Sequence, residues 1–421
     1  MIPFNRPSFV GDEPRYIREA IERGQLSGDG HFTKVCNAWI AHQTGAQTAF
    51  LTHSCTAALE MAALLADLAP GDEVIMPSFT FVSTANAVAL RGAVPVFVDI
   101  DPIFLNIDPK AAAAAVTPRT RAIIAVHYAG FPADMDALQA IADAHNLLVI
   151  EDAAQALGST YKGRQAGNLA DFGAFSFHET KNVISGEGGA LTVNRPELVD
   201  RAETIRQKGT DRSRFLRGQV DKYTWVDIGS SFLPGELIAA FLYGQLEKAS
   251  DIMAVRRALY NHYHTAFADL AASGRLGIPQ CPPDVVGNGH MFYLRMHDLD
   301  DRERFTAHMR SHDIHTPFHY VPLHSSPAGL KHGRAFGSMT VTNEISASLV
   351  RLPLFYTLGS EIETVISVAM DFLRGTNVRA PKPGVTAASY EIPAGSSLGS
   401  LAQSEVQPRP AWPTSDLIRR I

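Results

Sequence analysis

Phe175-Ser176-Phe177-His178-Glu179-Thr180-Lys181-Asn182 is the stretch that decides how this chain folds, because it places a lysine just beyond a short apolar run. That run, Gly173–Phe177, predicts a buried strand. Upstream, a second apolar run, Leu147–Glu151, leads directly into Asp152. The spacing of 29 residues from Asp152 to Lys181 leaves room for one strand and its connections. We therefore expect the carboxylate and the amine at the same end of one sheet.

A lysine and a buried carboxylate in this arrangement suit pyridoxal phosphate. The lysine amine forms a Schiff base with the aldehyde of that cofactor, and the acid keeps the pyridine nitrogen protonated. A carboxylate at the end of a buried strand needs a partner, and a pyridinium N–H supplies one. Two plainer interpretations stay open: Asp152 as the cap of the next turn, and Lys181 as a surface lysine before a hairpin.

Short apolar runs alternate with helical patterns from about residue 45 to residue 195. The runs are rich in Val, Ile and Phe, which is typical of strands buried on both faces. Such alternation predicts an α/β fold, with a mostly parallel central sheet and helices on both sides. The expected strands are Thr48–Leu51, Glu73–Met76, Val94–Ile100, Ala122–Tyr128, Leu147–Glu151, Gly173–Phe177 and Ala190–Val193. The expected helices include Thr56–Ala66, Met135–His145 and Pro196–Lys208.

Three parts of the chain differ in character. Residues 1–245 form the expected large cofactor-binding domain, and residues 246–375 a smaller C-terminal α+β domain reached through a long helical pattern, Glu236–Leu270, broken once. Residues 376–421 carry six prolines among small polar residues, which predicts an extended or disordered tail. The elements expected in the smaller domain are strands at Met291–Met296 and Thr316–His319 and helices at Arg302–Ser311 and Ser360–Phe372.

Composition excludes several classes of function. The chain has 421 residues and a net charge of −6 without a basic block, so nucleic acid is not an expected partner. Cys36, Cys55 and Cys281 are too scattered for a disulfide framework or a zinc site, which favours a reduced, cytoplasmic protein. The N-terminus lacks a signal pattern, and the apolar stretch Ala57–Ala69 is too short to span a bilayer, so no membrane association is expected. The histidines lack metal-ligand spacing, so we expect no metal; those considered are His127, His178, His319 and His324.

The segment His53-Ser54-Cys55-Thr56-Ala57 lies between an expected strand and an expected helix. Unpaired N–H groups and the helix dipole make such a junction a phosphate site, and the Ser176 hydroxyl could reach the same phosphate. An ordinary N-capped helix is the alternative. Phe79 and Phe81 offer rings that could stack on a cofactor, although core packing explains most phenylalanines.

Together these motifs resemble the DegT/DnrJ/StrS family of sugar-nucleotide aminotransferases, over roughly residues 1–373. The resemblance implies fold type I, the aspartate aminotransferase-like fold of pyridoxal-phosphate-dependent transferases. The segments that carry it are Leu26–Gly30, Ser54–Ala57, Pro77–Asn86, Val126–Gly130, Phe175–Asn182, Arg217–Trp225 and His319–His324.

The resemblance also implies roles for single residues. Lys181 is the implied Schiff-base lysine, and Asp152 the implied partner of the pyridine nitrogen. Gln155 is implied to hydrogen-bond the phenolate oxygen of the cofactor, and Phe81 to stack on its ring. The implied contacts to the phosphate come from the backbone N–H groups of Cys55 and Thr56 and from Ser176.

The implied assembly is a homodimer whose active sites borrow residues from the neighbouring subunit. One departure concerns that exchange. Many family members carry Gly-x-Asn-x-Arg where this chain has Gly229-Ser230-Ser231-Phe232-Leu233, and their asparagine reaches the partner's cofactor phosphate. Ser231 stands at that position, so we expect a shorter hydroxyl contact there.

The implied reaction transfers the amino group of L-glutamate to C4 of dTDP-4-dehydro-6-deoxyglucose, giving dTDP-4-amino-4,6-dideoxygalactose. Basic side chains suit the diphosphate of such a substrate, although a solvated basic loop is an equal alternative for each of them. The residues expected to bind the substrate are Arg212, Arg214, Arg217, Lys222, Tyr223 and His319.

Other functions stay open at this point. A 3-keto or differently configured keto-sugar nucleotide could be the substrate, and a non-catalytic regulator could bind pyridoxal phosphate without turnover. Dehydratases of the same fold replace the lysine by histidine, so Lys181 argues against that activity. The sequence supports a nicotinamide-dependent dehydrogenase still less, because no G-x-G-x-x-G follows the first expected strand.

Overall fold

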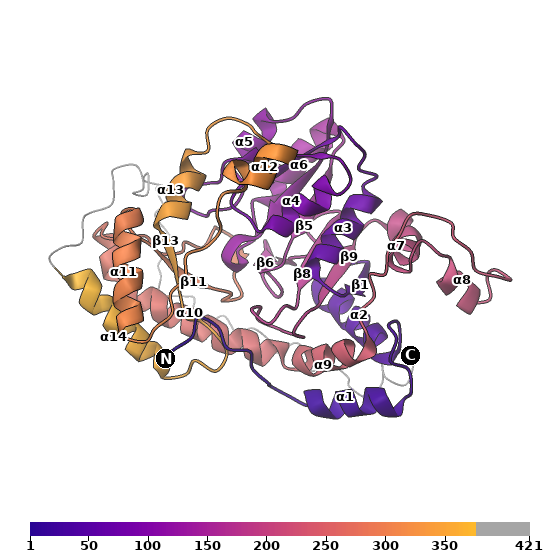
Figure 1. The fold of residues 1–421 in the computed structure, drawn as a ribbon, viewed down its shortest axis with the longest axis horizontal. Coiled ribbons are helices and arrows are strands. Elements are labelled where there is room, and N and C mark those ends of the chain that lie inside the picture. The colour runs from indigo at the N-terminus through magenta and orange to yellow at the C-terminus, as the bar shows by residue number, and fades with distance from the viewer. Residues whose placement is uncertain (376–421) are drawn as a thin grey trace.

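The computed structural model describes residues 1–375 and is built around an eight-stranded sheet (Figure 1). The strand order is β1-β9-β8-β5-β4-β2-β3-β12. Only β9 runs against its neighbours within this sheet, and the remaining pairs are parallel. The strands of this sheet are β1 (Thr48–Thr52), β2 (Glu73–Pro77), β3 (Val94–Val98), β4 (Thr120–Val126), β5 (Leu148–Asp152), β8 (Phe172–Ser176), β9 (Gly189–Val193) and β12 (Arg334–Ala335).

Helices cover both faces of this sheet, which gives the α/β architecture that the alternating pattern predicted (Figure 1). All seven expected strands are present, and their bounds agree with the prediction to within two residues. The helices are α1 (Glu13–Glu22), α2 (His31–Thr44), α3 (Cys55–Leu65), α4 (Val82–Ala89), α5 (Pro109–Ala114), α6 (Met135–His145), α7 (Val199–Arg206), α8 (Arg212–Leu216), α9 (Glu236–Glu247), α10 (Ala249–Ala272), α11 (Leu299–Ser311), α12 (Pro327–His332), α13 (Thr340–Ser348) and α14 (Glu361–Arg374).

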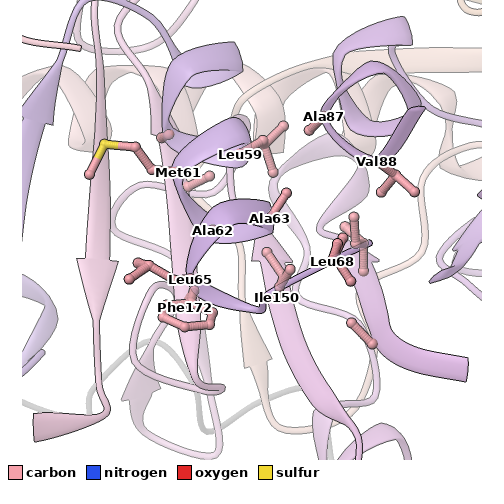
Figure 2. Close-up of a cluster of buried hydrophobic side chains, with 14 of the residues drawn as sticks. Leu59, Met61, Ala62, Ala63, Leu65, Leu68, Ala87, Val88, Ile150 and Phe172 are labelled. Carbon is pink, nitrogen blue, oxygen red and sulfur yellow. The ribbon is translucent and has the colours of Figure 1, made fainter. Parts of the chain in front are cut away.

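The small side chains of α3 let this helix lie close to the sheet. Ser54 caps it by accepting a hydrogen bond from the Ala57 N–H at 3.1 Å. Figure 2 shows Leu65 next to Phe172 of β8, and Leu59 directed toward α4. This packing fixes the N-terminus of α3 at the edge of the sheet where the parallel strands end.

A separate hydrophobic core joins α10, α11 and α14 to a two-stranded sheet of β11 (Phe292–Arg295) and β13 (Leu349–Leu352). The expected long helix is broken once, at Lys248 between α9 and α10. The strand expected at Thr316–His319 was wrong: this segment has only an isolated bridge from Phe318. Pro317 supplies no N–H there, so a regular ladder cannot form. The minor strands are β6 (Thr160–Tyr161), β7 (Arg164–Gln165) and β10 (Val285–Val286).

Within residues 1–375, no helix combines the length and the apolar character needed to cross a membrane. The division of the chain at residue 245 into a large and a small domain stays a prediction. The proline-rich tail, residues 376–421, lies outside the described residues.

Candidate active site

The carboxylate of Asp152 ends β5 and is buried. Its Oδ2 accepts a hydrogen bond from Oγ1 of Thr84 at 2.7 Å, and its Oδ1 accepts one from the backbone N–H of Ala154 at 3.3 Å. Because Thr84 gives its proton to Asp152, the 2.9 Å contact between Thr80 and Thr84 has Thr80 as donor. Two threonines of the loop and helix after β2 therefore orient the carboxylate.

Lys181 lies in the loop after β8, beside the end of β5, as its spacing from Asp152 predicted. Burial and the charge of Arg351 lower the pKa of its amine, while Cys55 and Asp152 act in the opposite direction. Burial and the charge of Asp152 raise the pKa of the Cys55 thiol, so it stays protonated. Lys181 therefore interacts electrostatically with both Asp152 and the thiol of Cys55 at the N-terminus of α3.

The N-terminus of α3 fits against the start of β9 with no space for a side chain. A Cβ on Gly189 would lie 2.4 Å from the backbone nitrogen of Cys55. Gly189 is paired with Ser176, so the Ser176 hydroxyl borders the same position. The Ser54 side chain occupies the N–H of Ala57, which leaves the N–H groups of the first two helical residues for an anion.

Gln155 follows Asp152 in the loop after β5 and is held on both sides of its amide. Its Oε1 accepts a hydrogen bond from the Ala129 N–H at 2.7 Å, and its Nε2 donates one to the hydroxyl of Tyr320 at 2.8 Å. The Phe81 side chain is 56% exposed and stands just before α4, with its ring 6.4 Å from that of Tyr320. Phe81 is therefore free to cover a flat ring in the site.

Behind the carboxyl edge, His127 and Glu151 form a fully buried pair, with Nε2 and Oε2 2.9 Å apart. His127 Nδ1 accepts a hydrogen bond from the Ala133 N–H, so the proton is on Nε2 and is donated to Glu151. Glu151 also accepts the N–H groups of Gly167, Leu169 and Ala170. This pair locks the strand end that carries Asp152.

A family model described as the DegT/DnrJ/EryC1/StrS aminotransferase family matches residues 8–370. The chain belongs to this family. One of its relatives is the spore coat polysaccharide biosynthesis protein SpsC of Bacillus subtilis (strain 168), which is 34% identical over 392 residues. That alignment covers 89% of this chain and 98% of SpsC.

Solved structures of relatives share the fold of this aminotransferase. The aminotransferase TlmJ of Streptoalloteichus hindustanus has a TM-score of 0.81 at 30% identity, over 89% of this chain and 99% of TlmJ. The pyridoxal phosphate form of the putative sugar aminotransferase Spr1654 of Streptococcus pneumoniae has a TM-score of 0.79 at 26% identity, over 88% of this chain and 99% of Spr1654. The predictions of fold type I, of a transaminase and of pyridoxal phosphate as cofactor are confirmed.

The residues at the carboxyl edge fit that cofactor. Lys181 offers an amine to its aldehyde, and Asp152 offers an acceptor to its ring nitrogen. The first two N–H groups of α3, which Gly189 allows to lie close to β9, offer donors to its phosphate. The single roles of these residues stay predictions, including those of Gln155 and Phe81.

The residues expected to bind the nucleotide are not at this edge. They belong to an arm, residues 211–227, which includes α8 and projects from the body at the right of Figure 1. Arg217 already pairs with Glu203 through two contacts of 2.9 and 2.8 Å. Ser231 is exposed at the base of the arm and is paired with Gln207. The exposed residues of the arm with expected substrate roles are Arg212, Arg214, Arg217, Lys222 and Tyr223.

His319, also expected to bind substrate, is buried between two tyrosines. Its Nδ1 lies 2.8 Å from the hydroxyl of Tyr128, and its ring stacks on that of Tyr320 at 3.6 Å. Burial and the charge of Arg351 lower its pKa well below the ordinary histidine value. His319 is therefore neutral and supports Tyr320 from behind.

Sequence reasoning missed Thr84, Tyr320 and Arg351. Thr84 and Tyr320 lie in segments that carry the family resemblance, Pro77–Asn86 and His319–His324, so the resemblance could have indicated them. Arg351 lies in β13, and no motif in the surrounding sequence indicates a place in the site. Its guanidinium donates to the backbone oxygen of Phe318 at 2.9 Å, and burial lowers its pKa.

Potential metal ligands also occur within residues 1–375. His297, Asp298 and Asp301 have ligand atoms within 4.8 Å of one another, at the start of α11. The guanidinium of Arg304 contacts the carboxylate of Asp301, so a positive charge is already present in this group.

Proposed function

We propose that this aminotransferase acts on a nucleotide sugar, transferring the amino group of L-glutamate to C4 of dTDP-4-dehydro-6-deoxyglucose. The product would be dTDP-4-amino-4,6-dideoxygalactose. The observation that carries the chemistry is the juxtaposition of Lys181 and Asp152 beside the N-terminus of α3. The sugar is supported by the relatives, since SpsC is named for polysaccharide biosynthesis and Spr1654 as a putative sugar aminotransferase.

Bound pyridoxal phosphate supplies an electron sink for the carbon that carries the amino group. Lys181 supplies the proton transfer. Burial lowers the pKa of its amine, so more of it is unprotonated near neutral pH than for an exposed lysine. An unprotonated Nζ can take the proton from Cα of glutamate and later return a proton to C4 of the sugar.

Asp152 and its neighbours hold the ring of the cofactor. Both partners of the carboxylate, Thr84 Oγ1 and the Ala154 N–H, are donors, so Asp152 presents itself as an acceptor to the ring nitrogen. Burial raises the pKa of the Tyr320 hydroxyl, which therefore keeps its proton; Gln155 donates to its oxygen. Tyr320 is thus left with one O–H to donate within the site.

We propose Arg351 as the cation that binds a carboxylate of glutamate. Its charge acts electrostatically on both Lys181 and Tyr320. Its guanidinium is partly engaged by one backbone carbonyl, so N–H groups remain for a forked contact with a carboxylate.

We further propose a homodimer in which the arm of one subunit completes the nucleotide site of the other. The arm exposes apolar side chains as well as its basic ones, and Trp225 is 76% exposed. Exposed aromatic and aliphatic side chains on a projecting segment indicate a protein interface. We place the enzyme in the cytoplasm, where its three cysteines, which are all free, stay reduced.

Proton NMR of the product formed from dTDP-4-dehydro-6-deoxyglucose and L-glutamate tests the proposal. An axial amine at C4 is the expected result. An equatorial amine would mean that the enzyme makes a product of the other configuration at C4. Release of oxoglutarate from glutamate without conversion of the sugar would mean a different keto sugar, and no oxoglutarate at all would indicate a non-catalytic cofactor-binding regulator.

A further inference from the structure

Asn182 follows Lys181 directly, and its buried amide is fully engaged. Its Nδ2 donates to the backbone oxygen of Asn288 at 3.1 Å and lies 3.3 Å from the sulfur of Met253. Its Oδ1 lies 2.9 Å from Nδ1 of His290. Because the amide oxygen can only accept, His290 carries its proton on Nδ1 and donates it to Asn182.

His290 is neutral in this contact. Burial, with the positive charges of Lys181 and Arg256, lowers its pKa well below the ordinary value. A neutral imidazole has one N–H, and here that N–H is committed to the residue next to Lys181.

The segment from Asn288 to His290 is itself firmly held. The buried guanidinium of Arg256 donates to the backbone oxygens of Gly289 at 3.2 Å and of His290 at 2.6 Å. Asn288 Nδ2 donates to the backbone oxygens of Gln155 at 2.8 Å and of Leu157 at 3.0 Å. The same segment therefore fixes both the neighbour of Lys181 and the backbone of Gln155.

We propose that Asn182 and His290 are positioning residues that set where the Lys181 backbone lies relative to Gln155. A lysine side chain has four rotatable bonds, so the reach of its amine depends on a fixed backbone anchor. When the Lys181 backbone is held in this way, its Nζ can reach the aldehyde of a cofactor that Gln155, fixed by the same segment, also contacts. The proposal rests on the assignment of Lys181 as the residue that binds pyridoxal phosphate covalently.

The test uses the full-length protein freed of its cofactor and then supplied with pyridoxal phosphate. The lysine amine and the aldehyde condense to a C=N bond with loss of one water, which visible absorbance follows; borohydride reduction and peptide mapping locate the bond. Asn182→Ala is expected to slow this attachment by about 10- to 100-fold, the range expected for a displaced reacting group. His290→Ala should act similarly, whereas His290→Asn, which keeps an N–H near the Nδ1 position, should restore most of the rate.

Asn194→Ala is the matched control. Asn194 follows the opposite end of β9 from Gly189, and its Nδ2 also donates to two backbone oxygens, those of Gly167 and Ala170. It should lose stability, measured by thermal unfolding, without slowing attachment. Attachment at the wild-type rate in both Asn182→Ala and His290→Ala, or equal slowing in Asn194→Ala, would overturn the positioning role. A wild-type protein that carries the cofactor on another residue would instead overturn the assignment of Lys181.

Discussion

Gly189→Ala should weaken binding of the cofactor phosphate by driving the N-terminus of α3 away from the sheet. The added Cβ would lie 2.3 Å from the carbonyl carbon of Ser54 and 2.4 Å from the nitrogen of Cys55. Ordinary contact starts at 3.4 Å, and both neighbours are backbone atoms, so the helix terminus has to retreat by about 1 Å. Overpacking of this kind costs about 1–3 kcal/mol of stability as well.

A retreat of about 1 Å converts a hydrogen bond of about 2.9 Å into a gap too long to count as one. A hydrogen bond to a charged group contributes about 1.5–3 kcal/mol. With two N–H groups affected, those of Cys55 and Thr56, the loss is about 3–6 kcal/mol, which corresponds to a rise of roughly 10²- to 10⁴-fold in the dissociation constant.

The assay compares the dissociation constants of pyridoxal phosphate and of pyridoxal, which lacks the phosphate. In Gly189→Ala the first should rise steeply and the second should change little. Gly235→Ala is the control, because a Cβ there meets only the Leu26 oxygen at 3.5 Å. Unchanged affinity for pyridoxal phosphate, or an equal loss for both compounds, would refute the placement of the phosphate at α3.

Three further substitutions test other parts of the structure. Lys181→Ala should abolish transamination while the protein still folds, and measurable steady-state turnover by this variant would contradict the mechanism. Because the pKa of Lys181 is lowered in the folded state, the unfolded state binds more protons. The free energy of unfolding of the wild-type apoprotein should therefore rise toward pH 10.5, and that of the variant should not. Thr84→Val removes the donor to Asp152 Oδ2 and should lower kcat about 10-fold with little change in the KM for glutamate; an unchanged kcat would exclude this orienting role. Burial alone would raise the pKa of Glu73, but hydrogen bonds from two arginines lower it to about 2, so wild-type stability should fall as the pH drops from about 4.5 toward 2. Glu73→Gln should lack that fall, and its free energy of unfolding in urea at pH 7 should be about 2–3 kcal/mol lower than that of the wild type. This loss is smaller than the whole pKa shift of Glu73 would give, because the two arginines are partly exposed. Equal acid sensitivity in both proteins would show that other groups control the loss of stability in acid.

The sheet could be predicted because its strands are short, apolar and separated by clear helical patterns. Met135–His145 was predicted with the bounds that the structure has, since an aspartate precedes it and a left-handed asparagine ends it. The Thr316–His319 strand failed because Thr316 and Phe318, which favour strands, flank a proline that cannot donate to a ladder.

The sequence could predict only those candidate site residues that lie just beyond the ends of strands. Lys181 and Asp152 each follow an apolar run, so sequence spacing was enough to bring them together. Arg351 and His290 reach the same place from distant segments, and only the tertiary fold reveals them. The pairing of Arg217 with Glu203 was equally hidden, because charge along the arm does not show which cations are already occupied.

The pairing of Ile2 with the segment around Ile314 has a consequence for synthesis. The Ile2 N–H donates to the oxygen of Asp313 at 2.7 Å, and the N–H of His315 donates to the oxygen of Ile2 at 3.0 Å. More than three hundred residues leave the ribosome between these partners. The N-terminal segment, which also bonds the loop of Lys181 through Asn5 and Glu179, therefore cannot settle until translation has passed residue 315. A nascent chain stalled earlier should therefore lack the contact of Asn5 to the loop of Lys181.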